Sequence, residues 1–109
     1  MSDDEFRKMM AALGAEFRQG LPERMDLVDR LWRRLCDGRV DQASMIELIQ
    51  TLHTLAGSAG TFGLDEVGAT AAEAESRLEA YREAGTVADA AGRAEISRVL
   101  ETLRRVAEA

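Results

Sequence analysis

The sequence predicts an all-α fold, an antiparallel up-down-up-down four-helix bundle with a short capping helix at its N-terminus. Apolar residues recur every three or four positions along nearly all of the chain, and no useful length alternates with the period of a strand. Four amphipathic segments joined by short turns are typical of a bundle. The 109 residues include one proline and show no tandem repeat or linker. We therefore expect a single domain over residues 1–109.

The first predicted element is a short helix within residues 1–14. Ser2 and Glu5 have the spacing of a capping box, and helical spacing of apolar residues follows them. Gly14 is expected to loosen the chain, so that this helix covers one end of a bundle formed by residues 15–109. The apolar positions of the short helix are Phe6, Met9, Met10 and Leu13.

The first two bundle helices are predicted around residues 17–35 and 45–62. Pro22 lies near the start of the first, where it either kinks the helix or opens it as a first-turn residue. Gly38 is expected to end the first helix and Gly63 the second. Two further apolar stripes, over residues 67–81 and 90–106, predict the last two helices. The residues expected to begin these later helices are Asp41 or Ser44, then Asp65, then Thr86.

Composition excludes several classes of function. A net charge of −6 argues against nucleic acid as a partner, because binding it requires a basic surface. Cys36 is the only cysteine, which excludes an internal disulfide, and with one histidine it is too few for a structural zinc site. Carboxylates alone leave a hard cation open. No segment resembles a secretory signal or a membrane span. We expect a cytoplasmic monomer that binds neither nucleic acid nor membrane.

The stretch LHTLAGSAGTFG contains the only histidine, His53. His53 lies one helical step from the apolar stripe, and three small residues share its face: Ala56, Gly57 and Gly60. Each glycine costs a helix about 0.5–1 kcal/mol relative to alanine. This loss of helix stability is explained if a bulky group must approach the imidazole closely, because glycine leaves the space for it. The alternatives are that the glycines permit close helix packing and that the histidine is an ordinary surface residue.

The same helix lacks charge around the histidine. Residues 48–64 contain no ionisable acid or base apart from His53, and Ser, Thr, Gly, Gln and Ala occupy the polar positions instead. An uncharged surface of small residues around an imidazole favours docking against another protein.

This stretch resembles the signature of histidine phosphotransfer (HPt) domains, which include the phosphorylated first domain of chemotaxis kinases. The family pattern is a histidine, two residues, usually a lysine, then glycine, a small pair and a closing glycine, often with phenylalanine before it. The resemblance covers about residues 17–106 and implies a four-helix bundle with the histidine exposed midway along the second bundle helix. The positions that fit the pattern are Gly57, Ser58, Ala59, Phe62 and Gly63.

The resemblance implies that His53 accepts a phosphoryl group at Nε2 and passes it on. Such a domain is not an enzyme and has no cofactor of its own, since a partner receiver domain supplies Mg²⁺ and the catalytic groups. The implied partners are response-regulator receiver domains and/or a sensor histidine kinase. Family members commonly place Gln or Glu 22 residues after the histidine to hold Nδ1, and that position here is Glu75. The alternative for Glu75 is a solvated surface acid.

Ala56 departs from the family pattern, because most members have lysine there. That lysine helps to neutralise the added phosphoryl charge. Three arginines are candidates to replace it, unless nothing does: Arg33, Arg34 and Arg77. Two further functions stay open. One is that the chain is the phosphoacceptor domain of a chemotaxis-type kinase. The other is that it is a receiver-binding helical adaptor that is not phosphorylated, and Ala56 favours this adaptor.

Overall fold

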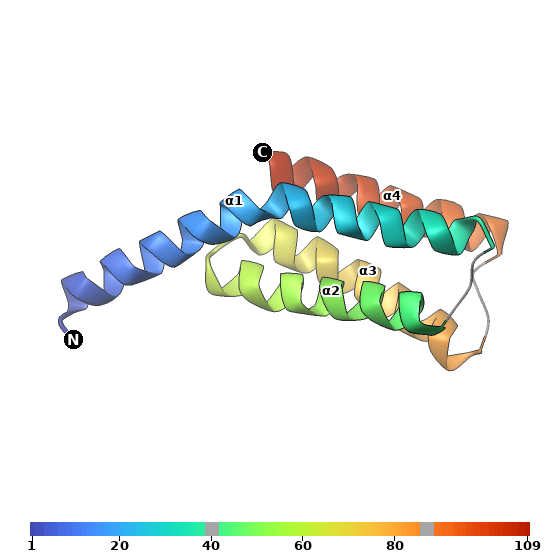
Figure 1. The fold of residues 1–109 in the computed structure, drawn as a ribbon, viewed down its shortest axis with the longest axis horizontal. Coiled ribbons are helices and arrows are strands. Elements are labelled where there is room, and N and C mark those ends of the chain that lie inside the picture. Colours follow the sequence, from blue (N-terminus) through green and yellow to red (C-terminus); the bar gives the residue numbers. More distant parts are fainter. Residues whose placement is uncertain (39–41, 86–88) are drawn as a thin grey trace.

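The structure is a computed structural model that describes residues 1–38, 42–85 and 89–109 of the chain. Its elements are α1 (Asp3–Cys36), α2 (Gln42–Thr61), α3 (Asp65–Glu83) and α4 (Ala90–Glu108). Each helix packs against the next, and α1 also packs against α4, which closes the ring of a bundle (Figure 1). Successive helices run in opposite directions, so the predicted antiparallel four-helix bundle is confirmed.

The N-terminal part of the chain differs from the prediction of a separate helix over residues 1–14. Asp3–Cys36 is one unbroken helix of 34 residues, and its N-cap is Ser2, whose Oγ accepts a hydrogen bond from the Glu5 amide at 3.2 Å. Gly14 does not interrupt it. The position is buried, and a Cβ there would lie 3.5 Å from the Phe62 ring, which is an ordinary van der Waals distance.

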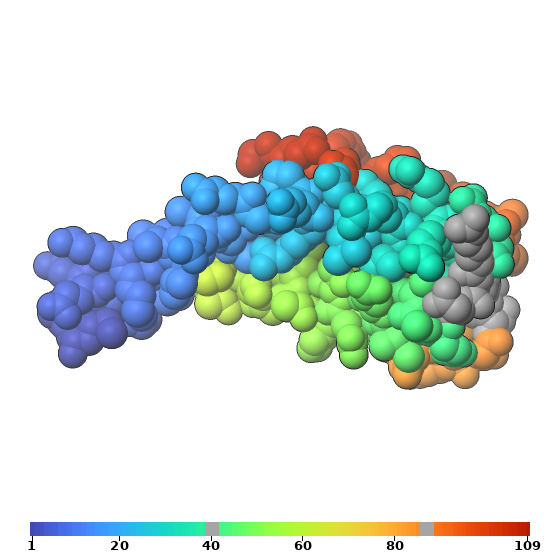
Figure 2. Space-filling model, viewed as in Figure 1, coloured from blue at the N-terminus to red at the C-terminus, as the bar shows by residue number. Residues whose placement is uncertain are grey.

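The first turns of α1 also do not cover the end of the bundle as expected. They project beyond it, with no other helix alongside (Figures 1 and 2). Phe6 and Leu13 are consequently 51% and 41% exposed. The molecule is 51 Å long and 24 by 19 Å across, and 51 Å is also the length of 34 helical residues at 1.5 Å each.

Pro22 lies inside α1 and does not open a helix there. Its ring removes one backbone donor, and Figure 1 shows that α1 changes direction between its projecting part and its packed part. Ser44 lies within α2 and is buried, so it does not cap that helix, and Asp41 falls outside the described residues. Asp89, rather than Thr86, caps α4, since its side chain accepts a hydrogen bond from the Gly92 amide at 2.8 Å. Thr86 itself also lies outside the described residues.

The core runs along the inside of the bundle and is almost wholly aliphatic. Leucines from all four helices are fully buried in it, and Phe17 stacks on Phe62 with ring centroids 5.5 Å apart. Trp32 of α1 is buried on the side of α4 and donates a hydrogen bond from Nε1 to Ser97 Oγ at 2.9 Å. In the described part of the chain, no helix combines the length and the hydropathy needed to cross a bilayer.

Candidate functional site

His53 stands in the middle of α2 and points out of the bundle. Leu52 and Leu55 on either side of it are buried to 0% and 1% exposure, because they face the core. One helical step of about 100° separates His53 from Leu52 and carries it out of that stripe. Its side chain is 76% exposed. The imidazole is therefore accessible to a reactant from solvent.

Glu75 of α3 holds the imidazole from one side. Its Oε2 lies 2.8 Å from His53 Nδ1, and its side chain is only 21% exposed. An ionised carboxylate can only accept a hydrogen bond, so Nδ1 carries the hydrogen and donates it. In the neutral ring the lone pair is then on Nε2, which is the nucleophilic nitrogen. The structure thus brings together the two residues that the sequence placed 22 positions apart.

Gly57 and Gly60 leave open space beside the histidine. Both are exposed, and a Cβ added at either would meet no atom within 4 Å. The close-packing explanation does not hold for the outer side of these two glycines, where their side chains would stand, because no helix covers that side. Ala56 sits deeper, half-buried against the core. A bulky surface can therefore approach His53 over the two glycines.

Gly68 of α3 is the residue that does permit close packing, and our sequence reasoning missed it. A Cβ there would lie 3.3 Å from the Ala56 carbonyl oxygen and 3.5 Å from the Gly60 amide nitrogen. The helix that carries Glu75 consequently lies close against the helix that carries His53. Its place in the sequence could have indicated this role, because Gly68 falls on the same stripe of small buried residues as Ala71 and Ala74.

Gly63 ends α2 and turns the chain into α3. Its φ of 76° is left-handed, a conformation that glycine adopts without a Cβ clash. The Gly63 amide donates to the Gly60 carbonyl at 3.3 Å, and the Leu64 amide donates to the Ala59 carbonyl at 2.8 Å. These two bonds form a Schellman motif. The tight turn returns the chain alongside α2, where Glu75 meets His53.

The outer surface of α2 around the histidine is polar but uncharged. Gln50, Thr54 and Thr61 are exposed there together with the two glycines. The Thr61 hydroxyl bonds back to the Gly57 carbonyl at 3.0 Å, so it stays close to the helix. This surface offers no fixed charge that a docking protein would have to pair.

The three arginines considered as substitutes for a lysine at position 56 do not lie beside His53. Arg33 lines a groove between α1 and α4. Arg77 pairs with Glu95 of α4 at 2.7 Å and with Glu73 of its own helix at 3.2 Å. Arg34 belongs to the last turn of α1, and α1 runs antiparallel to α2, so this arginine is level with the start of α2. That start is eleven residues, about 16 Å, from His53.

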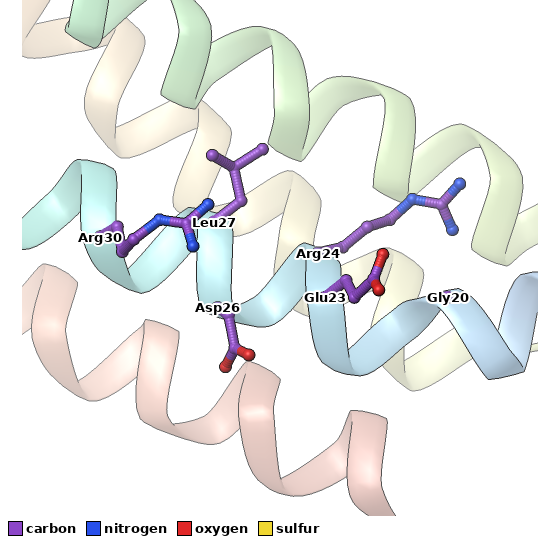
Figure 3. Close-up of a pocket in the computed structure, with 6 residues that line it drawn as sticks. All are labelled: Gly20, Glu23, Arg24, Asp26, Leu27 and Arg30. Atoms are coloured by element: carbon purple, nitrogen blue, oxygen red, sulfur yellow. The ribbon is translucent and has the colours of Figure 1, made fainter.

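A shallow depression of about 540 Å³ lies elsewhere, on the outside of α1 (Figure 3). Arg24 and Leu27 point from it toward α2, and Asp26 points toward α4. The Arg24 guanidinium stacks on the Phe17 ring, 4.9 Å from its centroid. Opposite charges alternate along this surface, and no residue of the His53 site lines it. The six lining residues are Gly20, Glu23, Arg24, Asp26, Leu27 and Arg30.

Fold and site together define a helical module that presents one histidine, held by a carboxylate, on an uncharged surface. The family model of the Hpt domain matches residues 5–109, and the chain belongs to this family. Hpt domains carry phosphoryl groups in phosphorelays and interact there with receiver domains and histidine kinases. Neither the curated proteins nor the solved structures gave a match. Among the described residues, no group of three or more His, Cys, Asp or Glu is placed to hold a metal ion.

Proposed function

We propose that His53 is the phosphoacceptor of this chain and exchanges a phosphoryl group with the aspartate of a receiver domain. The observation that carries this proposal is the contact of 2.8 Å between His53 Nδ1 and Glu75 Oε2, on an imidazole that is otherwise exposed. It fixes the hydrogen on one nitrogen and leaves the other free to attack.

The transfer step balances without a base. The Nε2 lone pair forms the new N–P bond while the P–O bond to the donor aspartate breaks, and the released carboxylate takes that electron pair. Nδ1 keeps its hydrogen, so the phosphorylated ring carries a positive charge. The Glu75 carboxylate stabilises that charge through the hydrogen bond. The receiver supplies Mg²⁺ and the groups that neutralise the transferred phosphoryl.

The open space over Gly57 and Gly60 supports docking of a receiver above the imidazole. In-line transfer requires the aspartyl phosphate to come within about 3–3.5 Å of the attacking nitrogen. Large side chains at these two positions would stand between the surfaces. The lack of charge on α2 fits the same role.

A receiver-binding adaptor that is never phosphorylated is the second candidate, and Ala56 is the observation that favours it. This side chain carries no charge and packs against the core. Both candidates predict receiver binding, and only the phosphocarrier predicts a covalent label.

The test is to incubate the purified chain with a phosphorylated receiver and to look for an acid-labile, alkali-stable label. We expect a label on the wild type and none on His53→Gln, which keeps a polar side chain of similar size. A wild type that binds receivers but stays unlabelled would leave the adaptor. A label that survives His53→Gln would show that the acceptor is another residue.

A further inference from the structure

Phosphorylation of His53 would add negative charge beside a residue that is already acidic. A phosphoryl group adds about −1.5 to −2 charges at pH 7. The charged side chain in contact with His53 is itself an acid, Glu75. A counter-charge supplied by the same chain would favour the phosphorylated state after the receiver has left.

Arg82 of α3 is placed to supply this charge. It lines a small cavity of about 120 Å³ between α2 and α3, together with Gln50 and Glu79. Gln50 lies one turn before His53 on α2, and Glu79 lies one turn after Glu75 on α3. The cavity therefore lies about one helical turn along α2 and α3 from the contact between His53 and Glu75.

The side chains of His53 and Arg82 are expected to tilt toward each other. Every helical side chain tilts toward the N-terminus of its own helix. His53 therefore tilts toward Gln50, and Arg82 tilts toward Glu79. Because α2 and α3 are antiparallel, these two directions converge on the same part of the seam between the two helices. Arg82 follows Glu75 by seven residues, about 10.5 Å along the axis, and the flexible arginine stem shortens that gap.

The present partner of Arg82 binds it weakly. Its Nη1 lies 3.4 Å from Glu79 Oε2, and the two side chains are 43% and 34% exposed. Exposed pairs of neighbouring residues on a helix contribute little to stability. A phosphoryl group offers more charge and more acceptor oxygens than one carboxylate.

We propose that Arg82 leaves Glu79 and binds a phosphoryl oxygen when His53 is phosphorylated. Arg82 then neutralises the phosphoryl charge, as a cation at position 56 would otherwise do. Glu79 competes with the phosphoryl group for Arg82. This inference rests on the proposed function of His53.

The test uses phosphoramidate, a small donor that phosphorylates histidine without a receiver. The phosphorylated chain is titrated by ³¹P NMR, and its equilibrium yield with a receiver is measured in parallel. Arg82→Ala should raise the pKa of the phosphoryl group, because a nearby cation favours the dianion, and should lower the yield about fivefold. Arg82→Lys should restore much of both. Glu79→Gln should shift both in the opposite direction.

Arg98→Ala is the matched control, since it removes the same charge from the groove between α3 and α4. A titration of Arg82→Ala that coincides with that of the wild type, or an equal shift in Arg98→Ala, would overturn the role of Arg82. Failure of the proposed function looks different, because the wild type would then take no label from the receiver. Melting curves of each variant exclude loss of fold as the cause.

Discussion

The hydrogen bond from His53 to Glu75 links the imidazole on α2 to a second helix, α3. Glu75→Ala should slow phosphoryl transfer into His53 about tenfold, since a hydrogen bond to a charged group contributes about 1.5–3 kcal/mol before its exposure is discounted. Glu75→Gln should lose less, because an amide oxygen still accepts from Nδ1. Single-turnover rates with a phosphorylated receiver measure both effects.

Glu66→Ala is the control, because it removes an exposed acid from the same helix without touching His53. Equal rates for the Glu75 and Glu66 variants would contradict the role of Glu75. Their bundle stability should be similar, since the His53 side of the contact is largely in solvent.

Much of this site could be predicted at the residue scale, because helical periodicity fixes direction. The step from Leu52 placed His53 outside the core stripe, and the family spacing of 22 residues pointed to Glu75. The position of Arg82 could not be predicted in the same way. It depends on the register between α2 and α3, which is set by the turn at Gly63 and by the close approach at Gly68.

At the scale of elements, replacing a glycine of α2 and a glycine of α3 by alanine should change the stability of the bundle in opposite directions. Gly57→Ala should raise the free energy of unfolding by about 0.5–1 kcal/mol, because the methyl group enters open space and alanine favours the helix. Gly68→Ala should lower it, because a Cβ 3.3 Å from the Ala56 carbonyl oxygen forces the helices apart. Such overpacking costs about 1–3 kcal/mol, which exceeds the gain in propensity.

Urea denaturation of the two variants checks this pair. Equal stabilisation by both substitutions would show that α2 and α3 are not in close contact at Gly68. The gain in Gly57→Ala should leave phosphoryl transfer nearly unchanged, whereas Gly57→Leu should obstruct docking of a receiver and spare labelling by phosphoramidate.

The projecting turns of α1 form a second element with its own behaviour. The side chains of residues 3–13 contribute little to the core, and isolated helices of this length are marginal in water. We expect their amides to exchange much faster than those of α2. Removal of residues 1–12 should leave the melting temperature almost unchanged, and a fall of several degrees would contradict this.

This element also shows where sequence reasoning fails. The periodicity of α1 continues unbroken through Gly14, but glycine has the same low helix propensity whether it breaks a helix or serves packing. Only the structure distinguishes the two cases, because it shows Gly14 buried inside a continuous helix and facing Phe62 of the turn after α2. The four helices themselves could be predicted because their apolar stripes are local.

At the scale of the whole molecule, Arg104 ties the last helix to the first. Its Nε donates to Asp29 Oδ2 and its Nη2 to Asp26 Oδ1, each at 3.0 Å. Hydrogen bonds to Asp29, and then to Asp26, raise the pKa of Arg104 above its ordinary value. Arg104→Gln should lower the free energy of unfolding by about 1 kcal/mol, a modest effect because the group is partly exposed.

Arg105→Gln is the matched control, since the neighbouring arginine is exposed and its Nη2 donates to Thr102 of its own helix. Thermal unfolding at low and high salt compares the two. The Arg104 effect should shrink at high salt, as screening weakens the ion pairs. Equal effects of both substitutions would show that the contact with α1 contributes nothing.

The hydrogen bond of Trp32 to Ser97 has a practical consequence for observing this protein. Trp32 is the only tryptophan, so tryptophan emission, excited at wavelengths that tyrosine does not absorb, has one source, at the seam of α1 and α4. His53 and Glu75 lie across the bundle, at the seam of α2 and α3. Tryptophan emission therefore reports opening of the bundle and stays constant when a phosphoryl group arrives. A spectrum recorded during transfer is thus an internal check that the fold is intact.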